Sequence, residues 1–373
     1  MRSTPSGRFR LPGGGTRREM TERVLIVTDA WHPQVNGVVR TLTRLAQELA
    51  EQGIDVRFLT PDGFRTLPLP FYLDIRFALA SPRQVARRIA EIAPRSVHIA
   101  TEGPLGWLAR RVCMGEGLAF TTSYHTKFPE YLRARVPVPE SWSYALLRKF
   151  HNAGQGVMVA TPSLGADLAR RGYTNIRPWT RGVDAEFFHP KWKDDLALPG
   201  PVFLCVGRVA VEKNLPAFLD LDLPGSKVIV GDGPDLPGLK ERYPEAHFLG
   251  ACSNEELARI YASADVFVFP SRTDTFGNVL LEAMASGCPV AAFPVTGPSD
   301  IVGDGGVLSD DLHQAALAAL EVPRESARVR ALAYSWPECA RQFLDHLRPA
   351  GGRPPVGQEK AQDVRHRDVS SRA

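Results

Sequence analysis

The stretch RVLIVTDAWHPQVNGVVRTLTRLAQELAEQG, residues 23–53, carries the pattern that decides the fold. Its first part, residues 23–28, is a short β-branched and apolar run, which is typical of a buried parallel strand. Its second part, residues 38–52, places three leucines on one face of a helix. Gly53 follows at the position where glycine commonly ends helices. The stretch therefore predicts a strand, a loop and a helix in that order.

Strand and helix patterns alternate along the rest of the chain and restart after a linker near residues 189–195. Further strands are expected at residues 55–60, 96–100, 119–124, 156–160, 201–206, 227–231, 246–250, 265–270 and 289–293. Further helices are expected at residues 82–92, 105–114, 254–263, 278–286 and 326–347. This order predicts an α/β fold with two Rossmann-like units, each a parallel sheet covered by helices on both faces. A ligand would bind between them, at the carboxyl ends of the strands.

The length of 373 residues suits two domains of ordinary size. We expect a disordered tail at 1–21, a first domain at 22–190, a second at 191–325, a C-terminal helix at 326–348 and a disordered tail at 349–373. The first twenty residues lack the apolar core of a secretory signal. The sequence leaves open whether translation starts at Met1 or Met20.

The composition is that of a soluble globular protein, with 44% hydrophobic and 23% charged residues. No run of about 18 apolar residues is present, which argues against a transmembrane helix. The five cysteines are scattered and form no Cys-x-x-Cys pair. This pattern disfavours a disulfide scaffold or a zinc finger and indicates a reducing compartment.

Charge is distributed unevenly along the chain. Residues 1–190 hold 26 Lys and Arg against 16 Asp and Glu, whereas residues 191–373 hold 19 against 25. A basic first half can attract nucleic acid, acidic lipid headgroups or nucleotide phosphates. An ordinary solvated arginine-rich face is the alternative.

The segment at residues 271–290 follows one expected strand and opens a helix. Asp274 falls in the loop at the end of the strand, and Gly277 allows backbone to approach a ligand closely. The free N–H groups at the start of the helix suit a phosphate. Glu282 lies one turn into that helix, so two carboxylates would flank one anion site and hold hydroxyls of a ligand. The alternative is that Asp274 caps the helix and Glu282 is a surface charge.

Two other strand ends carry groups that suit phosphate. Arg208 and Lys213 lie five positions apart after a strand, so a guanidinium fork and a point charge could converge on a diphosphate; surface roles are the alternative. Gly37 precedes a helix in a similar turn. The chain has neither the Gly-x-Gly-x-x-Gly pattern of nicotinamide-dinucleotide enzymes nor a P-loop, so both classes are disfavoured.

His125 also follows a strand and would face the predicted cleft, although a lone histidine in a polar loop is commonly structural. Asp220 and Asp222 form an Asp-x-Asp pair, which we interpret as a turn because Leu-Pro-Gly follows it. No His, Cys or carboxylate cluster has the spacing of a metal site, so no metal is expected.

Together these segments resemble the retaining glycosyltransferases of family four, which have the GT-B fold of two facing Rossmann-like domains. The resemblance covers residues 22–347 and is closest to bacterial enzymes that glycosylate lipids. It rests on the stretches at residues 29–39, 207–214, 230–234, 274–287 and 334–336. It implies that the first domain binds the acceptor, that the second binds a nucleotide sugar, and that the last helix crosses back to the first domain.

The resemblance implies a catalytic set of His125, Arg208, Lys213 and Asp274. Arg208 and Lys213 would hold the donor diphosphate and stabilise its departing charge. Gly37 would give backbone room near the same phosphates. His125 would lie beside the reacting sugar.

The remaining donor contacts follow from the same resemblance. Asp274 would hold hydroxyls of the sugar and Glu282 would bind the ribose. Most members have glutamate where this chain has Asp274, so its reach to the sugar is shorter. The base would rest near Leu249, Gly250 and Ala251. The sugar and phosphate would be lined by Phe276, Gly277, Asn278 and Val279.

The family resemblance further implies retention of the anomeric configuration without a protein nucleophile. It implies no metal, because Arg208, Lys213 and helix-terminal amides would supply the positive field. No cofactor is expected, and the co-substrate would be a nucleotide diphosphate sugar linked to UDP or GDP. The sequence leaves the base, the sugar, the linkage and the oligomeric state open.

The implied acceptor is a membrane lipid such as diacylglycerol or phosphatidylinositol. The enzyme would then be cytoplasmic and peripheral at the inner face of the cytoplasmic membrane. Basic residues that suit docking on an anionic bilayer are Arg83, Arg87, Arg88, Arg110, Arg111, Arg133, Arg135, Arg148 and Lys149. Residues that suit insertion at the interface are Phe128, Tyr131, Leu132 and Trp142. Ordinary helix surface and core aromatics are the alternative.

Two other functions stay open at this point. A nucleotide-sugar epimerase shares the two-domain fold, although the segment at residues 271–290 with Arg208 and Lys213 favours the transferase. A nucleic-acid-binding protein would use the basic first half. Neither aromatic RNP-like strands nor a helix-turn-helix pattern supports that reading, so we expect no nucleic-acid partner.

Overall fold

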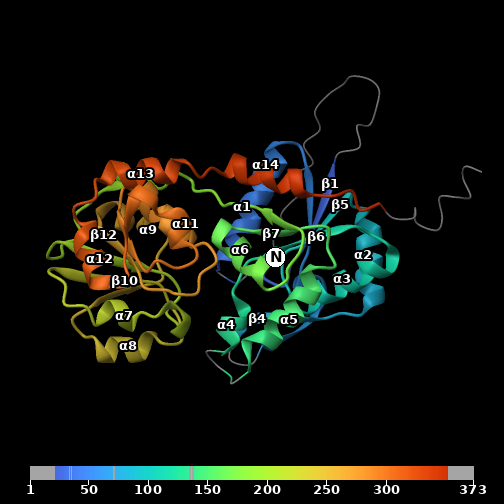
Figure 1. The fold of residues 1–373 in the computed structure, drawn as a ribbon, viewed down its shortest axis with the longest axis horizontal. Coiled ribbons are helices and arrows are strands. Elements are labelled where there is room, and N and C mark those ends of the chain that lie inside the picture. The colour runs from blue at the N-terminus through green and yellow to red at the C-terminus, as the bar shows by residue number, and fades with distance from the viewer. Residues whose placement is uncertain are drawn as a thin grey trace, which may run out of the picture.

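The computed structural model describes residues 22–351, except residues 33, 35, 70, 71, 134, 135 and 137. This chain forms two halves that lie side by side, each built on a six-stranded parallel sheet (Figure 1). The strand order is β2-β1-β5-β6-β7-β8 in the first half and β11-β10-β9-β12-β13-β14 in the second. The predicted α/β fold with two Rossmann-like parallel sheets is confirmed.

The first half contains more elements than the sequence predicted. Its parallel strands are β1 (Arg23–Val27), β2 (Asp55–Leu59), β5 (Ser96–Ile99), β6 (Phe120–Tyr124), β7 (Val157–Val159) and β8 (Ile176–Pro178). Its helices are α1 (Gly37–Glu51), α2 (Pro82–Ile92), α3 (Pro104–Glu116), α4 (Phe128–Arg133), α5 (Glu140–His151) and α6 (Pro162–Arg170). The 3-10 turn η1 (Pro61–Gly63) and an unpredicted antiparallel hairpin, β3 (Arg65–Leu69) and β4 (Tyr72–Leu79), precede α2.

The second half follows the linker, which contains the 3-10 turn η2 (Pro190–Trp192). Its strands are β9 (Val202–Val206), β10 (Ser226–Val230), β11 (His247–Gly250), β12 (Val266–Phe269), β13 (Val290–Ala292) and β14 (Gly306–Leu308). Its helices are α7 (Pro216–Leu219), α8 (Leu236–Arg242), α9 (Asn254–Ser263), α10 (Asn278–Ala285), α11 (Pro298–Ile301) and α12 (Leu312–Ala319). The 3-10 turns η3 (Val211–Lys213) and η4 (Gly303–Gly305) complete it.

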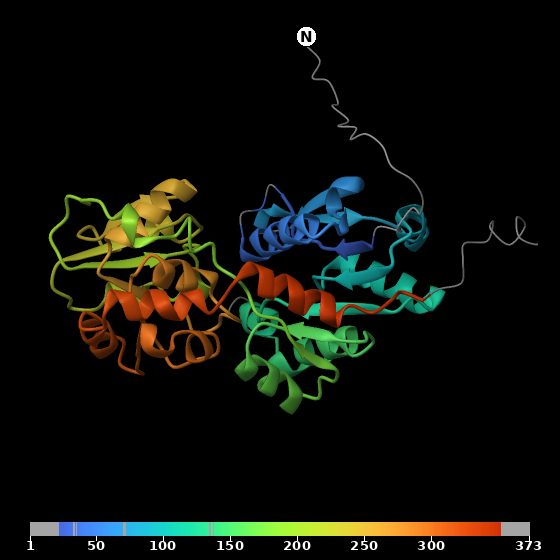
Figure 2. The same ribbon diagram turned by 90° about the horizontal axis from the view of Figure 1, so that it is seen from above.

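The prediction of one long helix near residues 326–347 is wrong. The segment holds two helices, α13 (Arg324–Leu332) and α14 (Trp336–His346). The side chain of Ser335 accepts from the backbone N–H of Glu338 and so begins a new helix. α13 packs on α10 in the second half, whereas α14 lies beside α1 in the first half (Figure 2).

The chain crosses between the halves twice, and the two crossings touch. The first crossing contains Gly182, and the second joins α13 to α14. The backbone N–H of Val183 donates to the carbonyl of Tyr334 (3.1 Å). A Cβ atom on Gly182 would lie 2.4 Å from the backbone nitrogen of Trp336. Only a glycine therefore allows this approach without a backbone shift.

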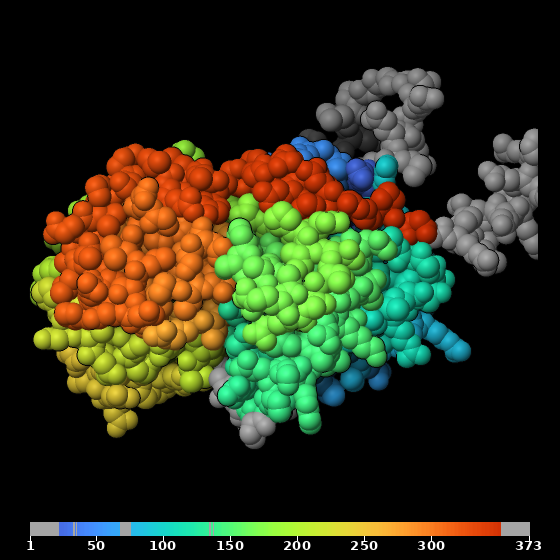
Figure 3. All heavy atoms as spheres, in the orientation of Figure 1, coloured from blue at the N-terminus to red at the C-terminus, as the bar shows by residue number. Residues whose placement is uncertain are grey.

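A further contact joins the halves at α6 and α11, which meet on the face shown in Figure 3. The backbone N–H of Ser163, on α6, donates to the carboxylate of Asp300, on α11 (3.0 Å). The guanidinium of Arg330 in turn donates to the backbone carbonyl of Asp300 (2.9 Å). The halves are thus tied both at the crossings and at this contact.

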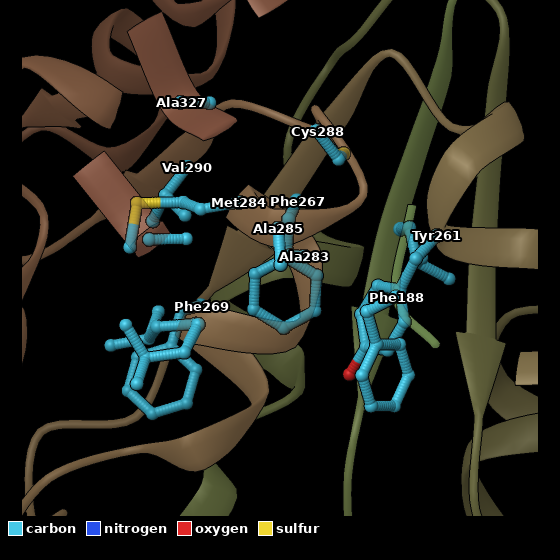
Figure 4. Packing of buried hydrophobic residues seen from close by; sticks show 14 of the residues in the cluster. Phe188, Tyr261, Phe267, Phe269, Ala283, Met284, Ala285, Cys288, Val290 and Ala327 are labelled. Carbon is cyan, nitrogen blue, oxygen red and sulfur yellow. The ribbon is translucent and has the colours of Figure 1, made fainter. Parts of the chain in front are cut away.

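Strand side chains alternate between the two faces of each sheet, which explains the cores. In β1, Leu25 and Val27 pack with residues of α2, α3 and α5, whereas Val24 and Ile26 pack with residues of α1 and α14. In the second half, β12 behaves in the same way. Its Phe267 packs with α9 and α10 (Figure 4), and its other face packs with α7 and α12.

The chain ends need one correction. The predicted tail at residues 349–373 starts too early, because Ala350 is buried and its carbonyl accepts from the N–H of Ala119 (2.7 Å). Residues 352–373 of that tail, and the tail at residues 1–21, lie outside the described residues. No helix in the described part of the chain is long and apolar enough to cross a membrane.

Candidate active site

Two charged side chains meet at the carboxyl edge of the second sheet. Lys213 ends η3, in the connection after β9, and Asp274 lies in the loop after β12. Because β9 and β12 are adjacent parallel strands, the loops that follow them meet at one edge. The ammonium of Lys213 contacts both carboxylate oxygens of Asp274 at 2.8 Å. The structure thus pairs two residues that the sequence assigned to different parts of a ligand.

The charge of Lys213 is fixed by this contact. Burial acts to lower the pKa of Lys213, but the Asp274 carboxylate outweighs it and holds the pKa above its ordinary value. The two side chains are 23% and 17% exposed, so solvent reaches the pair only in part. The site therefore presents a permanent cation beside an anion, which suits a phosphate next to a hydroxyl group.

The N-termini of α1 and α10 lie close together at the junction of the halves. Asn36 caps α1, whereas α10 starts after Gly277, at a φ of 91°, without a side-chain cap. Asn278 donates to the hydroxyl of Thr41 on α1 (3.3 Å), and a Cβ on Gly37 would lie 4.0 Å from the same amide nitrogen. A helix N-terminus carries partial positive charge, so this junction favours an anionic group.

Glu282 is buried, so the alternative of a surface charge is wrong. One carboxylate oxygen lies 2.8 Å from the guanidinium of Arg40, on α1, and the other accepts from the hydroxyl of Tyr261 (3.2 Å). Burial, followed by the nearby Glu282, raises the pKa of Tyr261 well above its ordinary value, so Tyr261 stays a donor. The contact with Arg40 joins the two halves beside the start of α10.

His125 follows β6 and lies against the loop that carries Asp274. Its backbone carbonyl accepts from the hydroxyl of Thr275 (2.7 Å), and its ring contacts the guanidinium of Arg181 (3.2 Å). Burial, and then the charges of Arg181 and two neighbouring histidines, hold the pKa of His125 well below its ordinary range. The imidazole is therefore neutral at physiological pH.

Arg208 and the expected base site lie along the same sheet edge. Arg208 is exposed in the connection after β9 and lines a small hollow of about 10 Å³ together with Gly207 and Lys213. Leu249, which is 47% exposed, and Gly250 end β11, two strands away from β9. The placement suits an extended ligand along the edge, and a base near Leu249 stays a prediction.

Not every predicted lining residue faces the junction. The side chain of Phe276 is 4% exposed and packs in the core of the second half, near the ring of Tyr334. Its predicted place in the sugar site is therefore limited to its backbone. Gly277, Asn278 and Val279 are partly buried and remain at the start of α10.

One aromatic residue departs from the expected membrane-facing set. The ring of Tyr131, on α4, lies near Asp274 and Lys213, and burial together with Asp274 raises its pKa to about 12. The electrostatic interaction of its phenol with this charged pair argues against the expectation that Tyr131 inserts into a bilayer. Trp142 and Phe128 are 72% and 50% exposed, as a surface role requires. The predicted basic residue Arg135 lies outside the described residues.

Sequence reasoning missed several residues at the junction. Arg181 and Arg40 were not singled out in the sequence, yet they reach His125 and Glu282. Asp29 was quoted only as part of a motif. It is buried and accepts from the backbone N–H groups of Leu105 (2.8 Å) and Gly106, at the start of α3. Asp29 therefore holds α3 in place, a role that its position directly after a strand could have indicated.

The sequence predicted no metal site. Among the described residues, no group of three or more His, Cys, Asp or Glu side chains could hold a metal ion. Asp220 ends α7 and accepts from the hydroxyl of Tyr243 (2.6 Å), which agrees with a structural turn.

Comparisons with known proteins decide the family. A model described as Glycosyltransferase Family 4 matches residues 35–187, and one described as Glycosyl transferases group 1 matches residues 200–322. A GDP-mannose-dependent alpha-mannosyltransferase of Corynebacterium glutamicum is 31% identical over 80% of this chain and 80% of its own length. The chain belongs to glycosyltransferase family 4. Because the chain is a glycosyltransferase, the alternative of a nucleotide-sugar epimerase is excluded.

Two further relatives match a smaller part of the chain or match at lower identity. Sulfoquinovosyl transferase SQD2 of Arabidopsis thaliana is 34% identical over 64% of this chain, which matches only 50% of that protein. An alpha-monoglucosyldiacylglycerol synthase of Streptococcus pneumoniae is 28% identical over 80% of this chain and 78% of its own length.

Solved structures confirm that this family 4 member has the GT-B fold. Sucrose-phosphate synthase of Thermosynechococcus elongatus superposes with a TM-score of 0.66 at 21% identity, covering 92% of this chain and all of that one. HepE of Anabaena, in complex with UDP and glucose, gives 0.63 at 14% identity over 87% of this chain and 98% of its own. The two facing sheets are therefore those of the GT-B architecture.

Proposed function

We propose that this glycosyltransferase moves a hexose from a nucleoside diphosphate sugar to a hydroxyl group of a membrane lipid, with retention at the anomeric carbon and without a metal. Diacylglycerol and phosphatidylinositol are the two proposed types of acceptor. GDP-mannose is the first donor to test, because relatives that match over most of their length carry that donor in their names.

One observation carries the proposal. The Lys213–Asp274 pair, the N-terminus of α10 and the His125 loop all meet where the two halves face each other. A cation and a helix N-terminus suit the diphosphate, and Asp274 can accept from sugar hydroxyls. The carboxyl edge of an open parallel sheet is also where such folds bind ligands.

The proposed reaction needs no protein nucleophile. The acceptor oxygen forms a bond to the anomeric carbon as the bond from that carbon to the β-phosphate oxygen breaks. The acceptor proton passes to the leaving diphosphate. Lys213 and Arg208 stabilise the charge that develops on that diphosphate. The carboxylates agree with this route, because Asp274 is held by Lys213 and Glu282 by Arg40 and Tyr261.

The proposed lipid acceptor is supported by the name of a relative and by side chains exposed on α4 and α5. The relative from Streptococcus pneumoniae is named for a diacylglycerol product. In this chain, Trp142 and Phe128 are exposed on α5 and α4, and the basic Arg133 lies on the same α4 helix. Exposed aromatic and basic side chains together suit a peripheral contact with an anionic bilayer, at the cytoplasmic face of the membrane.

The test separates donor from acceptor. Thermal stabilisation of the full-length protein is measured with GDP and with UDP, since a ligand of the folded state raises the melting temperature. Labelled GDP-mannose and UDP-glucose are then supplied with vesicles of phosphatidylcholine containing diacylglycerol or phosphatidylinositol. We expect a shift with one diphosphate and a labelled lipid whose new linkage has the configuration of the donor.

Three results would contradict the proposal. A labelled lipid of inverted configuration would contradict retention. Loss of activity after exhaustive chelation would contradict metal independence. Stabilisation by a diphosphate without any lipid product, but with a product on a soluble sugar, would remove the lipid acceptor.

A further inference from the structure

His125 has both ring nitrogens engaged inside the protein. Nδ1 lies 3.2 Å from Nη2 of Arg181, and Nε2 lies 3.0 Å from the hydroxyl oxygen of Ser123. The same hydroxyl lies 2.8 Å from Nε2 of His98, whose Nδ1 lies 2.9 Å from the hydroxyl of Thr121. These side chains form a continuous series of contacts from the first crossing to the interior of the first sheet.

The chemistry of the groups sets the direction of each hydrogen bond. A guanidinium only donates, so Nδ1 of His125 accepts and carries no proton. A neutral ring then holds its proton on Nε2 and donates it to Ser123. The Ser123 hydroxyl donates in turn to Nε2 of His98, which leaves the His98 proton on Nδ1, facing Thr121. One tautomer of each histidine satisfies the whole series.

We infer that Arg181, Ser123 and His98 are positioning residues that hold His125 as its neutral Nε2–H tautomer, so that the His125 ring transfers no proton in the reaction. The inference rests on the proposed function for the place of His125 beside the donor sugar. The ring then serves to fix the loop after β6, whose carbonyl at His125 meets Thr275 across the junction (2.7 Å).

Three titratable groups near the ring, Arg181, His98 and His151, oppose its protonation. Arg181, on the first crossing, is 3% exposed and donates to two backbone carbonyls, and no carboxylate among the described residues forms an ion pair with it. His98 lies on β5 and His151 on α5. Burial, then Arg181, His98 and His151, lowers the pKa of His125. The carboxylate of Glu102 is already in contact with His151 (3.0 Å).

His98, on β5, is a second buried histidine with a lowered pKa. Burial, followed by the charges of Arg181 and His151, lowers its pKa to about 3. It therefore remains neutral throughout the physiological range and can act as a fixed acceptor for Ser123. The Ser123 hydroxyl can donate to this neutral acceptor while its oxygen accepts from Nε2–H of His125.

The first test observes the tautomer directly. Nitrogen chemical shifts of the imidazole rings are recorded in full-length protein labelled with ¹⁵N-histidine, and the pair lost in His125→Gln identifies His125. We expect one protonated and one unprotonated nitrogen, unchanged as the pH falls from 8 to 5. An imidazolium, or a proton on Nδ1, at pH 7 would overturn the inference.

The second test uses two variants at Arg181. In Arg181→Met the ring loses its facing cation and its donor, so we expect His125 to titrate and the pH profile of kcat to gain an inflection between pH 5 and 8. Arg181→Lys keeps a cation and a donor, and its profile is expected to stay flat. An unchanged profile and tautomer in a folded Arg181→Met protein would contradict the proposed role.

Ser123→Ala tests the inner part of the series. Loss of this hydrogen bond is expected to lower kcat about five- to tenfold, while the donor KM changes less than about twofold. Ser226→Ala removes a buried hydroxyl in the second half, bonded to the carbonyl of Pro199, and serves as the matched control. A fall in Ser123→Ala no larger than that of the control would overturn the role of Ser123.

The tests distinguish this inference from the proposed function. If no nucleoside diphosphate binds, the proposed function fails while the ring-nitrogen measurement still reports the tautomer. If donor binding and transfer are found but His125 titrates near its ordinary pKa, the function stands and the inference fails.

Discussion

The two halves approach the junction with different chemistry on the same type of sheet. In the first half, the strands β5 and β6 carry buried polar side chains, namely Ser96, His98, Thr121, Thr122 and Ser123. In the second half, the neighbouring strands β9 and β12 are apolar, and the charged pair Lys213–Asp274 lies in the loops beyond them.

This difference separates two tasks. Charges held in loops, partly open to solvent, can meet an anionic ligand at a modest desolvation cost. Neutral hydrogen bonds inside a sheet are rigid because each buried polar group must keep its partner. The second half is therefore suited to bind charge, and the first half to fix geometry. Substitutions in each half test this division.

Lys213→Met removes the cation of the second half. We expect kcat/KM to fall about 100- to 1000-fold, since the loss of one group that stabilises developing charge has that effect. Binding of the free diphosphate, measured by calorimetry, should weaken in parallel. Lys240→Met, on the exposed face of α8, is the control and should retain wild-type values. Wild-type kcat/KM in a folded Lys213→Met protein would contradict the role of the second half in binding charge.

Gly182→Ala tests the rigidity on which the first half depends. The added Cβ would lie 2.4 Å from the backbone of Trp336, so the crossings must move apart. We expect a loss of about 1–3 kcal/mol in the free energy of unfolding, as for other overpacked sites. Urea denaturation measures it, with Gly115→Ala as control.

Gly115 is exposed on α3 and has no neighbour within 4 Å of an added Cβ, so its substitution should stabilise by about 0.5–1 kcal/mol. If the two variants changed the free energy of unfolding equally, the crossings would separate freely. That result would contradict a rigid contact between the crossings.

Glu282→Gln tests whether the second half holds the donor. If the carboxylate accepts from ribose hydroxyls, the donor KM should rise about tenfold, or about 1.4 kcal/mol, with kcat nearly constant. Glu255→Gln, at the exposed start of α9, is the control. A lower kcat with an unchanged KM would instead place Glu282 in the chemical step.

The pH dependence gives the smallest effect. The pKa of Lys213 is raised above its ordinary 10.5, so its cation is present at every pH below that value and is lost only as the pH rises through the raised pKa. We therefore expect no decline in kcat/KM from lysine deprotonation between pH 7 and 10. A decline with a midpoint near pH 9 in wild type, absent in Lys213→Arg, would contradict the ion pair.

The repeating pattern of strands and helices was sufficient to predict the fold, because buried parallel strands and amphipathic helices are local features. The break between α13 and α14 was missed, although Ser335 and Glu338 have the spacing of a helix start. The hairpin of β3 and β4 was missed, although residues 73–77 alternate apolar and charged side chains as a strand does.

The site was predictable only residue by residue. Lys213 and Asp274 were both identified, but their contact depends on β9 and β12 being neighbours, which no local pattern contains. Arg181 follows the three-residue strand β8, and a buried arginine looks like a surface arginine in a sequence. Contacts made by tertiary structure were therefore the part that sequence reasoning could not supply.

The position of α14 has a consequence for engineering this enzyme. The helix stands at the end of the chain, yet Cys339 and Phe343 pack with Leu42 and Trp179 in the core of the first half. A chimera that exchanges the second half between two relatives must therefore keep residues 336–350 with their own first half. Joining fragments at a single boundary near residue 190 would leave that core to be filled by a foreign helix.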